Sequence, residues 1–431
     1  MSIYKAFDEI DRPSSKIIDD CVHCGFCLSA CPTYLETGNE LDSPRGRIYL
    51  IKSAAEGKID MGESLVNHLD LCLGCLACET ACPSGVKYGS LIERSRAQIE
   101  RRYKRKWHDR LFKAVLFRIF PYASRLKLML PFFYIVSILK IKNVLKPKLL
   151  FRINPKIGSL FEMLPEVNTP FVSSFPEVIH SKTKKNYKVG FLTGCVQSAF
   201  FSKTNHATVD VLTRNGCEVF IPRMQGCCGA LSIHSGRLEE GRKFARKLID
   251  IFSVLNLDAV IVNSAGCGSS MKEYSDILKN DPAYKVKAEM ISGKTKDIME
   301  FLCEIEFESK LNPLEIKVTY QDACHIVHGQ GIRNQPRELL KRIPGLKLLE
   351  MKNSDHCCGS AGIYNIMQPE MSKRLLSEKL KNIEQLDPDY LVAGNPGCLI
   401  QIKKGIDQLN KKIKTAHPVE LLYWSINGKI K

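Results

Sequence analysis

Two short stretches, Cys21–Pro32 (CVHCGFCLSACP) and Cys72–Pro83 (CLGCLACETACP), carry one arrangement of cysteines. Both have the spacing C-x₂-C-x₂-C-x₃-C-P, a run that holds [4Fe–4S] clusters. Gly25 and Gly74 relieve crowding where the backbone bends closely around inorganic atoms. Two complete runs of this kind predict a chain that carries two [4Fe–4S] clusters and transfers electrons.

The fourth cysteine of each run decides how the ligands are shared. In two-cluster ferredoxins with this spacing, that cysteine binds the cluster of the other run. The first predicted ligand set is therefore Cys21, Cys24, Cys27 and Cys82, and the second is Cys72, Cys75, Cys78 and Cys31. Helical patterns surround both runs, so residues 1–100 are predicted to form a small helical module that the clusters help to stabilise.

The composition restricts the cellular setting and the cofactors. The chain has 431 residues and 18 cysteines, and its N-terminus is polar and acidic, unlike a secretory signal. Because thiols stay reduced in the cytosol, we expect a cytoplasmic location and metal or cluster sites rather than disulfides. The sequence shows no G-x-G-x-x-G after a strand and no P-loop. We therefore expect no flavin or NAD on this chain, with hydride chemistry done by another chain.

Residues 101–185 are predicted to form a basic helical connector. Between Arg101 and Lys156 there are 16 Lys or Arg residues and a single acid, Asp109, in a chain of net charge +17. The longest apolar run, Leu128–Leu139, has 12 residues, fewer than the ~20 needed to cross a bilayer. Three interpretations remain open: packing on the protein's own domains, docking of partner subunits, or peripheral contact with anionic lipid. No recognition fold for nucleic acid accompanies the charge, so nucleic acid is not an expected partner.

The second half of the chain is a tandem repeat, with residues 186–305 as the first copy and 306–431 as the second. Short β-rich runs alternate with helical patterns, and the cysteines of the first copy recur 129 to 131 residues later. This alternation predicts parallel α/β units with cysteines at the carboxyl ends of strands, where open α/β sheets bind ligands. The predicted fold class is thus α+β multidomain, a helical two-cluster module followed by tandem α/β repeats with parallel sheets.

Each copy carries four candidate metal ligands. They are Cys195, Cys227, Cys228 and Cys267 in the first copy, and Cys324, Cys357, Cys358 and Cys398 in the second. Gly229 and Gly359 permit the kink that lets adjacent thiols face one site. Three roles remain open: a further iron–sulfur cluster, a zinc or redox-thiol site, or structural thiols at an interface. The nearby histidines are expected to be hydrogen-bonded surface groups; they are His206, His234, His325, His328 and His356.

These motifs resemble a known family. Two ferredoxin runs followed by two CCG repeats are similar to the iron–sulfur subunit of bacterial glycolate oxidase (glycolate dehydrogenase). The more particular stretches are Ser43–Arg47 (SPRGR), Leu192–Gln197 (LTGCVQ), Gly226–Ala230 (GCCGA), Cys357–Gly362 (CCGSAG) and Gly394–Cys398 (GNPGC). The resemblance implies a complex in which flavin-bearing subunits oxidise glycolate to glyoxylate. This subunit would relay the electrons to an acceptor such as a quinone, at the inner face of the cell membrane, with D-lactate as a second implied substrate.

The same architecture also resembles the iron–sulfur subunits of anaerobic glycerol-3-phosphate dehydrogenase, of lactate-utilisation enzymes and of heterodisulfide reductase. The reductase repeats close with C-x-x-C, whereas here Cys267 is followed by GSS and Cys398 by LIQ. Both copies thus lack one ligand of that cluster, which argues against heterodisulfide chemistry. An iron–sulfur redox sensor is the alternative from another class, and two complete cysteine runs argue against it.

Overall fold

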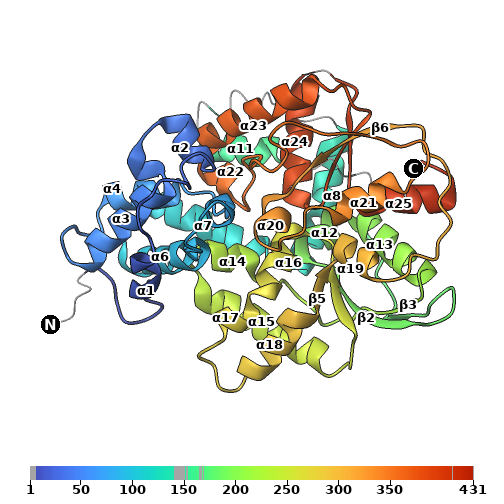
Figure 1. Cartoon of the computed structure of the whole chain (residues 1–431), viewed down its shortest axis with the longest axis horizontal. Helices are drawn as coiled ribbons and strands as arrows, with labels where there is room; N and C mark the ends of the chain where they lie inside the picture. Colours follow the sequence, from blue (N-terminus) through green and yellow to red (C-terminus); the bar gives the residue numbers. More distant parts are fainter. Residues whose placement is uncertain are drawn as a thin grey trace.

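The structure is a computed structural model that describes residues 6–139, 151, 154–164, 167, 169–409 and 411–430. The N-terminal helices, blue in Figure 1, occupy one side of the molecule, and the two α/β repeats fill the other. Of the connector helices, α7 lies beside the N-terminal module, whereas α8 and α11 lie against helices of the repeats.

The N-terminal module consists of short helices around a small apolar core. Pro32 and Pro44 each open a helix, a position where proline's missing N–H is not needed. The Ser43 hydroxyl accepts a hydrogen bond from the Gly46 N–H at 2.9 Å and so caps the second of these helices. Leu91 and Ile92 are buried in the core, as their helical spacing predicts. The elements are α1 (Ser15–Asp19), α2 (Pro32–Thr37), η1 (Glu40–Asp42), α3 (Pro44–Ala55), α4 (Glu63–Asp70), α5 (Ala77–Thr80) and α6 (Tyr88–Arg102).

Three helices of the connector are described: α7 (Trp107–Ile119), α8 (Ala123–Ile138) and α11 (Pro155–Glu162). Their inner faces pack on the protein itself, since Phe117 joins Ile363 in one cluster and Phe133 joins Phe200 in another. Of the three interpretations of the connector, packing on the protein's own domains is therefore confirmed for the inner faces of these helices. Much of the remaining predicted basic segment, residues 140–150, 152 and 153, lies outside the described residues.

The first repeat forms a five-stranded sheet in the order β1-β3-β2-β4-β5. All neighbours pair in parallel except β1, a short edge strand that is antiparallel to β3. Val189 at the centre pairs with Val219 on one side and Ala259 on the other. The strands are β1 (Val178–Ile179), β2 (Tyr187–Leu192), β3 (Cys217–Phe220), β4 (Ala259–Val262) and β5 (Thr295–Asp297). The helices are α12 (Cys195–Phe200), α13 (Ser202–Arg214), α14 (Ala230–His234), α15 (Leu238–Ser253), α16 (Ala265–Lys272), α17 (Tyr274–Ile277), α18 (Lys285–Lys294) and α19 (Ile298–Glu304).

The second repeat forms a parallel sheet in the order β7-β6-β8-β9, which matches β3-β2-β4-β5 of the first copy. The strands are β6 (Lys317–Gln321), β7 (Lys347–Leu349), β8 (Tyr390–Ala393) and β9 (Lys414–Ala416). The helices are α20 (Cys324–Val327), α21 (Gln335–Lys341), α22 (Tyr364–Met367), α23 (Pro369–Glu384), α24 (Pro396–Gln408) and α25 (Pro418–Asn427). The parallel α/β repeat that the sequence predicts is confirmed.

The two repeats share one hydrophobic core. Phe191 and Leu212 of the first copy lie in the same buried cluster as Val318, Leu339 and Trp424 of the second. In Figure 1, α13 and α25 lie side by side on the face where the copies meet. Because parallel sheets must be covered on both faces, each copy uses the other's helices as part of its cover.

Candidate iron–sulfur and thiol sites

Two small cavities inside the N-terminal module are each lined by thiols of both cysteine runs. The first is lined by Cys21, Cys24, Cys27, Cys78 and Cys82. The second is lined by Cys31, Cys72, Cys75 and Cys78. Each cavity thus contains the four thiols that the spacing predicts for one cluster. In the described part of the chain, no three His, Cys, Asp or Glu side chains are close enough together to hold a single metal ion. Thiols spread around a cavity are instead suited to a cluster of several metal ions.

The backbone of both runs has the shape that a close approach to a cluster requires. Gly25 and Gly74 have positive φ angles of 88° and 65°, a region that favours glycine. The Gly74 N–H donates a hydrogen bond to Cys72 Sγ at 3.4 Å. Amide donors to sulfur are one means by which a protein sets a cluster's reduction potential. The residues present therefore fit two [4Fe–4S] clusters.

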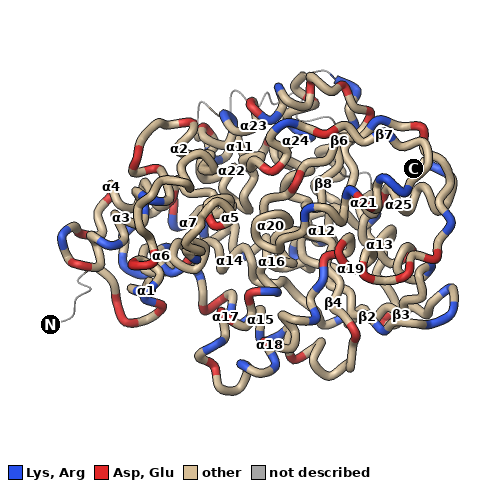
Figure 2. The backbone as a smooth tube through the Cα atoms, in the orientation of Figure 1, with Lys and Arg blue, Asp and Glu red and all other residues tan. Residues whose placement is uncertain are grey.

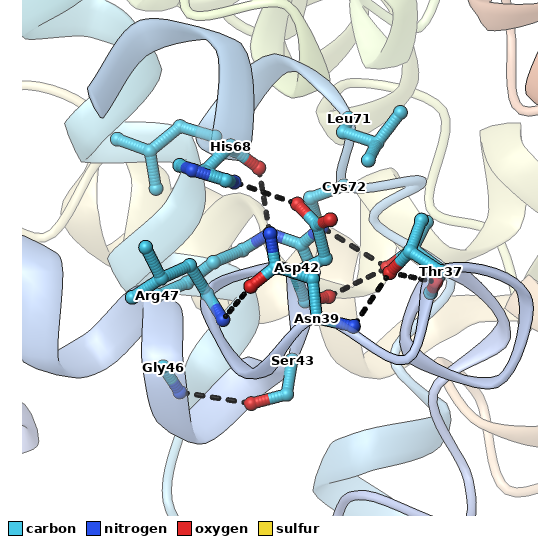
Figure 3. A network of polar contacts seen from close by, with 12 residues as sticks. Thr37, Asn39, Asp42, Ser43, Gly46, Arg47, His68, Leu71 and Cys72 are labelled. Carbon is cyan, nitrogen blue, oxygen red and sulfur yellow. Dashed lines mark hydrogen bonds and ion pairs between the residues drawn. The ribbon is translucent and has the colours of Figure 1, made fainter. Parts of the chain in front are cut away.

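A buried arginine lies beside the second cavity. Arg47, from the SPRGR stretch, is only 1% exposed. Its Nε donates to the His68 carbonyl at 2.7 Å and its Nη2 to Thr33 Oγ1 at 3.0 Å. Asp42 Oδ1 lies 4.0 Å from Nη2 and also 2.7 Å from His68 Nδ1 (Figure 3). The network holds the guanidinium in place, with Nη1 4.0 Å from Cys31 Sγ.

Arg47 and its neighbour Arg96 favour a thiolate in the second cavity. Burial raises the pKa of the Cys72 thiol, but the two guanidinium groups, the Gly74 N–H and the Tyr88 hydroxyl together hold that pKa below its ordinary value. Burial alone dominates at Cys75 and Cys78, whose pKa values lie well above the ordinary one. The second cavity thus has a buried positive charge beside the position of a negatively charged cluster.

In the first repeat, the four predicted cysteines form a row of touching thiols. Cys195 Sγ lies 3.7 Å from Cys227 Sγ, and Cys228 makes hydrogen bonds to both Cys227 and Cys267. Hydrogen bonds from Cys195 and Cys228 lower the pKa of Cys227. Gly229, at a φ of 85°, provides the kink that presents both adjacent thiols to the row.

The second repeat builds the same row with one difference. Cys357 contacts Cys324 and Cys358, and Cys358 contacts Cys398. Here the hydrogen bonds converge on the second cysteine of the adjacent pair, so that the pKa of Cys358 is the lowered one. In the first copy it is the first cysteine of the pair. The two rows are therefore similar in construction.

One cavity of about 810 Å³ connects these rows to the second cluster loop. Its lining includes all eight cysteines of the repeats together with Cys72 and Gly74. The opposite wall comes from α7, α8 and α11; apolar side chains such as Leu126, Phe133 and Leu160 form most of it, and the charged Asp109, Lys113 and Lys156 line it as well. In Figure 2 the region where α14, α16 and α20 lie together is mostly free of charged residues. We call this space the central cavity.

Two histidines of the central cavity depart from the expectation of surface groups. His234 and His325 line it, with ring centroids 4.8 Å apart and planes at 81°. Burial lowers the pKa of each to about 4. Sequence reasoning missed them because their partners are distant in the chain: His234 Nδ1 lies 2.6 Å from Glu93 Oε1, and His325 Nε2 lies 2.9 Å from the Gly74 carbonyl. The only indication in the sequence that these histidines belong to the site was their position next to the cysteine loops.

This geometry defines the class: an iron–sulfur protein with a two-cluster module and paired cysteine-rich α/β domains. Family comparisons agree, since residues 17–86 match the family described as "4Fe-4S dicluster domain" and residues 189–272 and 318–403 match "Cysteine-rich domain". The sequence is 38% identical to the probable glycolate oxidase iron-sulfur subunit of Bacillus subtilis, over 98% of each chain. It is 33% identical to the glycolate oxidase iron-sulfur subunit of Escherichia coli over 89% of each chain. Lactate utilization protein A of Geobacillus kaustophilus is 31% identical over 54% of this chain and 98% of its own.

The chain belongs to the family of glycolate oxidase iron–sulfur subunits. The resemblance stated from the sequence motifs is therefore confirmed.

Proposed function

We propose that this chain is the electron-transfer subunit of a complex that oxidises a 2-hydroxy acid, with glycolate as the first substrate. Two cavities carry this proposal, because the lining of each includes all four thiols of one predicted ligand set. When bound, each [4Fe–4S] cluster accepts and releases one electron. The chain's own residues hold the clusters and adjust the local charge, with the buried Arg47 beside the second set.

The cluster assignment is tested by counting metal. The full chain, purified without oxygen, should contain about eight irons and show two interacting cubane signals by low-temperature EPR after dithionite reduction. Cys24→Ser removes a thiol of the first cavity only and should abolish one signal. Cys303→Ser changes a half-buried cysteine outside these cavities and should leave both. Retention of both signals in Cys24→Ser would contradict the assignment.

We also propose that the thiol rows of the repeats bind metal. The support is geometric: the four thiols of each repeat line one cavity, and Cys195 Sγ lies 3.7 Å from Cys227 Sγ. About twelve irons or more would indicate further clusters, whereas zinc in stoichiometric amount would indicate a zinc site. In either case the extra metal should be lost in Cys228→Ala or Cys358→Ala. If wild type and variants contain eight irons and no zinc, the rows are structural thiols.

Substrate oxidation is proposed to occur on flavin-bearing partner subunits. Two relatives are named as subunits of glycolate oxidase, and no dinucleotide-binding motif occurs in this sequence. When glycolate is added, the clusters in the assembled complex should become reduced and show their EPR signals. The clusters of this chain alone should not be reduced by glycolate. D-Lactate is the second substrate to assay, because another relative is named for lactate utilisation.

We further propose that the outer face of α7 and α8 rests on anionic lipid at the inner face of the cell membrane. No single helix among the described residues is long and apolar enough to span a bilayer; α7 and α8 pass that test only as a pair bent by 99°. Exposed apolar side chains follow one stripe on each helix; they are Trp107, Leu111 and Val115, then Leu128, Phe132 and Ile135. Exposed cations flank this outer stripe; they include Lys104, Lys106, Arg110, Arg118 and Arg125. An apolar stripe with a basic border is typical of interfacial helices.

Vesicle binding tests this contact. The chain should sediment with phosphatidylglycerol vesicles and much less with phosphatidylcholine vesicles. Leu128→Glu, at a side chain 82% exposed, should weaken binding by about tenfold. Val254→Glu changes a side chain of similar exposure, 77%, at the end of α15 and should have no effect. Equal binding by both variants would contradict the proposed membrane contact.

A further inference from the structure

The loop over the first cavity lies at the protein surface, unlike the lining of the second. Cys24 is exposed, and so are the large apolar side chains of Val22 and Phe26 on either side of it; all three line the first cavity. In the second cavity three of the four predicted ligands are buried. The fourth, Cys75, packs against a buried cluster that includes Cys357 of the second repeat. The first cavity is therefore the one that a redox group on another protein can approach.

Helix α3 extends this exposed surface. Arg45 Nη1 donates a hydrogen bond to the His23 carbonyl at 3.0 Å, so the outer face of α3 lies beside the loop. Tyr49 follows one turn later on the same face of the helix and is 58% exposed. In Figure 1, α1 and α3 lie at the end of the molecule away from the repeats. We call this surface the first-cavity face; its apolar and aromatic members are Val22, Phe26 and Tyr49.

The charge of the N-terminal module is opposite to that of the rest of the chain. Residues 6–100 contain 9 Lys or Arg and 15 Asp or Glu, a net charge of −6, whereas residues 101–431 carry +22. On the first-cavity face itself the charges are mixed: Arg45 pairs with Glu40 at 2.8 Å and Lys52 with Asp19 at 3.1 Å. Lys16 and Asp20 are exposed beside them. A positively charged partner is attracted to this module and repelled by the remainder of the chain, which steers it to this end of the molecule.

We propose that the first-cavity face is the docking surface for the flavin-bearing partner subunit, whose matching patch is apolar at its centre and basic at its rim. This inference rests on the proposed electron-transfer function and assigns the entry of that relay. Exposed aromatic side chains that lie together, surrounded by polar residues, are typical of a protein interface. Oxidation of one 2-hydroxy acid leaves the partner's flavin reduced by two electrons. The flavin gives these electrons up one at a time, one to each cluster, and releases its protons to solvent.

Crosslinking tests the contact in the assembled complex. p-Benzoylphenylalanine is placed at Tyr49, which does not line either small cavity, so that the thiols are left in place. On irradiation it should crosslink to the flavin-bearing subunit. The control position is Ile10, which is 62% exposed and whose carbonyl accepts a hydrogen bond from Arg101 at the far end of α6, about 20 Å from Tyr88 and the first cavity. A crosslink from Tyr49 that is absent or much weaker from Ile10 supports the docking surface, and any other pattern overturns it.

The affinity of the cluster-loaded chain for the isolated flavin-bearing subunits is the second measurement. Phe26→Glu and Tyr49→Glu each place a charge on the apolar part of the face and should weaken binding about tenfold. Ile10→Glu, a matched change outside the face, should bind like wild type. Both cluster EPR signals are checked in each variant; if Phe26→Glu loses one, Tyr49→Glu still decides. Wild-type affinity should also fall as salt is added, because salt screens the attraction between the module and a basic partner. Unchanged affinity in Tyr49→Glu would overturn the docking surface.

The two proposals fail in distinguishable ways. If glycolate does not reduce the clusters of the wild-type complex, the electron-transfer function itself is wrong. If the clusters are reduced but Tyr49 gives no crosslink and Tyr49→Glu binds like wild type, only the docking surface is wrong.

Discussion

Arg47→Met is expected to lower the reduction potential of the cluster held by the second ligand set. The guanidinium is buried and its Nη1 lies 4.0 Å from Cys31 Sγ. Reduction adds a negative charge to the cluster, and a nearby fixed positive charge stabilises that state. Methionine fills similar space without charge, so the reduced cluster loses this stabilisation.

The size of the shift follows from this separation. At an effective dielectric constant of about 20, a unit charge at 4.0 Å contributes about 4 kcal/mol. For one electron, 1.4 kcal/mol corresponds to about 59 mV, so the full effect is about 170 mV. Cluster charge is spread over atoms farther from Arg47 than Cys31 Sγ, so we expect a fall of about 60 to about 170 mV.

An EPR-monitored redox titration measures both clusters in one sample. The cluster of the Cys21 set serves as the internal reference, since Arg47 does not line its cavity. Arg47→Lys keeps the positive charge but loses the paired hydrogen bonds to the His68 carbonyl and Thr33 Oγ1. It should therefore shift the reduction potential of the second cluster much less than Arg47→Met. If Arg47→Met retains its iron and both potentials stay within about 20 mV of wild type, the electrostatic argument is refuted.

Three further predictions concern the fold. Gly229→Ala and Gly359→Ala place a Cβ at positive φ and within 2.9 Å and 2.7 Å of backbone oxygens, so each should lower the free energy of unfolding by roughly 1–3 kcal/mol. Gly266→Ala, where a Cβ meets open space beside Cys267, should be close to neutral in the same denaturation assay. His417 caps α25 and burial lowers its pKa to about 3, below the ~6.5 of an unfolded histidine. The unfolded state therefore binds the extra proton, and the contribution of His417 to stability should fall by about 2 kcal/mol between pH 7 and pH 5. His417→Asn, which keeps a cap residue, should remove this part of the pH dependence.

Local patterns predicted the central strands and the grouping of the cysteines. β2, β4 and β8 are short apolar runs next to cysteine loops, and periodicity identifies such runs. The edge strands β5 and β9 were missed because Thr295–Asp297 and Lys414–Ala416 are three residues long and largely polar. β1 lies in the segment predicted as a basic helical connector and was missed, since two residues carry no periodic signal.

The central cavity and its polar groups could not be predicted from the sequence. Glu93 and His234 are separated by 141 positions, and only the packing of α6 against α14 brings them together. Arg47 was noticed as part of a characteristic stretch, but its burial depends on Asp42 and His68 from neighbouring elements. Spacing reveals ligands that share a loop, whereas a cavity between domains depends on contacts that no local pattern encodes.

The interleaved lining of the two small cavities has a consequence for biogenesis. Cys82 of the second run borders the first cavity, and Cys31 of the first run borders the second. Neither stretch can complete a cluster until the other has folded beside it. Insertion of the two cofactors should therefore be cooperative, so that maturation yields chains with both clusters or with none. A complex that accepts only the matured fold would then contain no half-loaded relay.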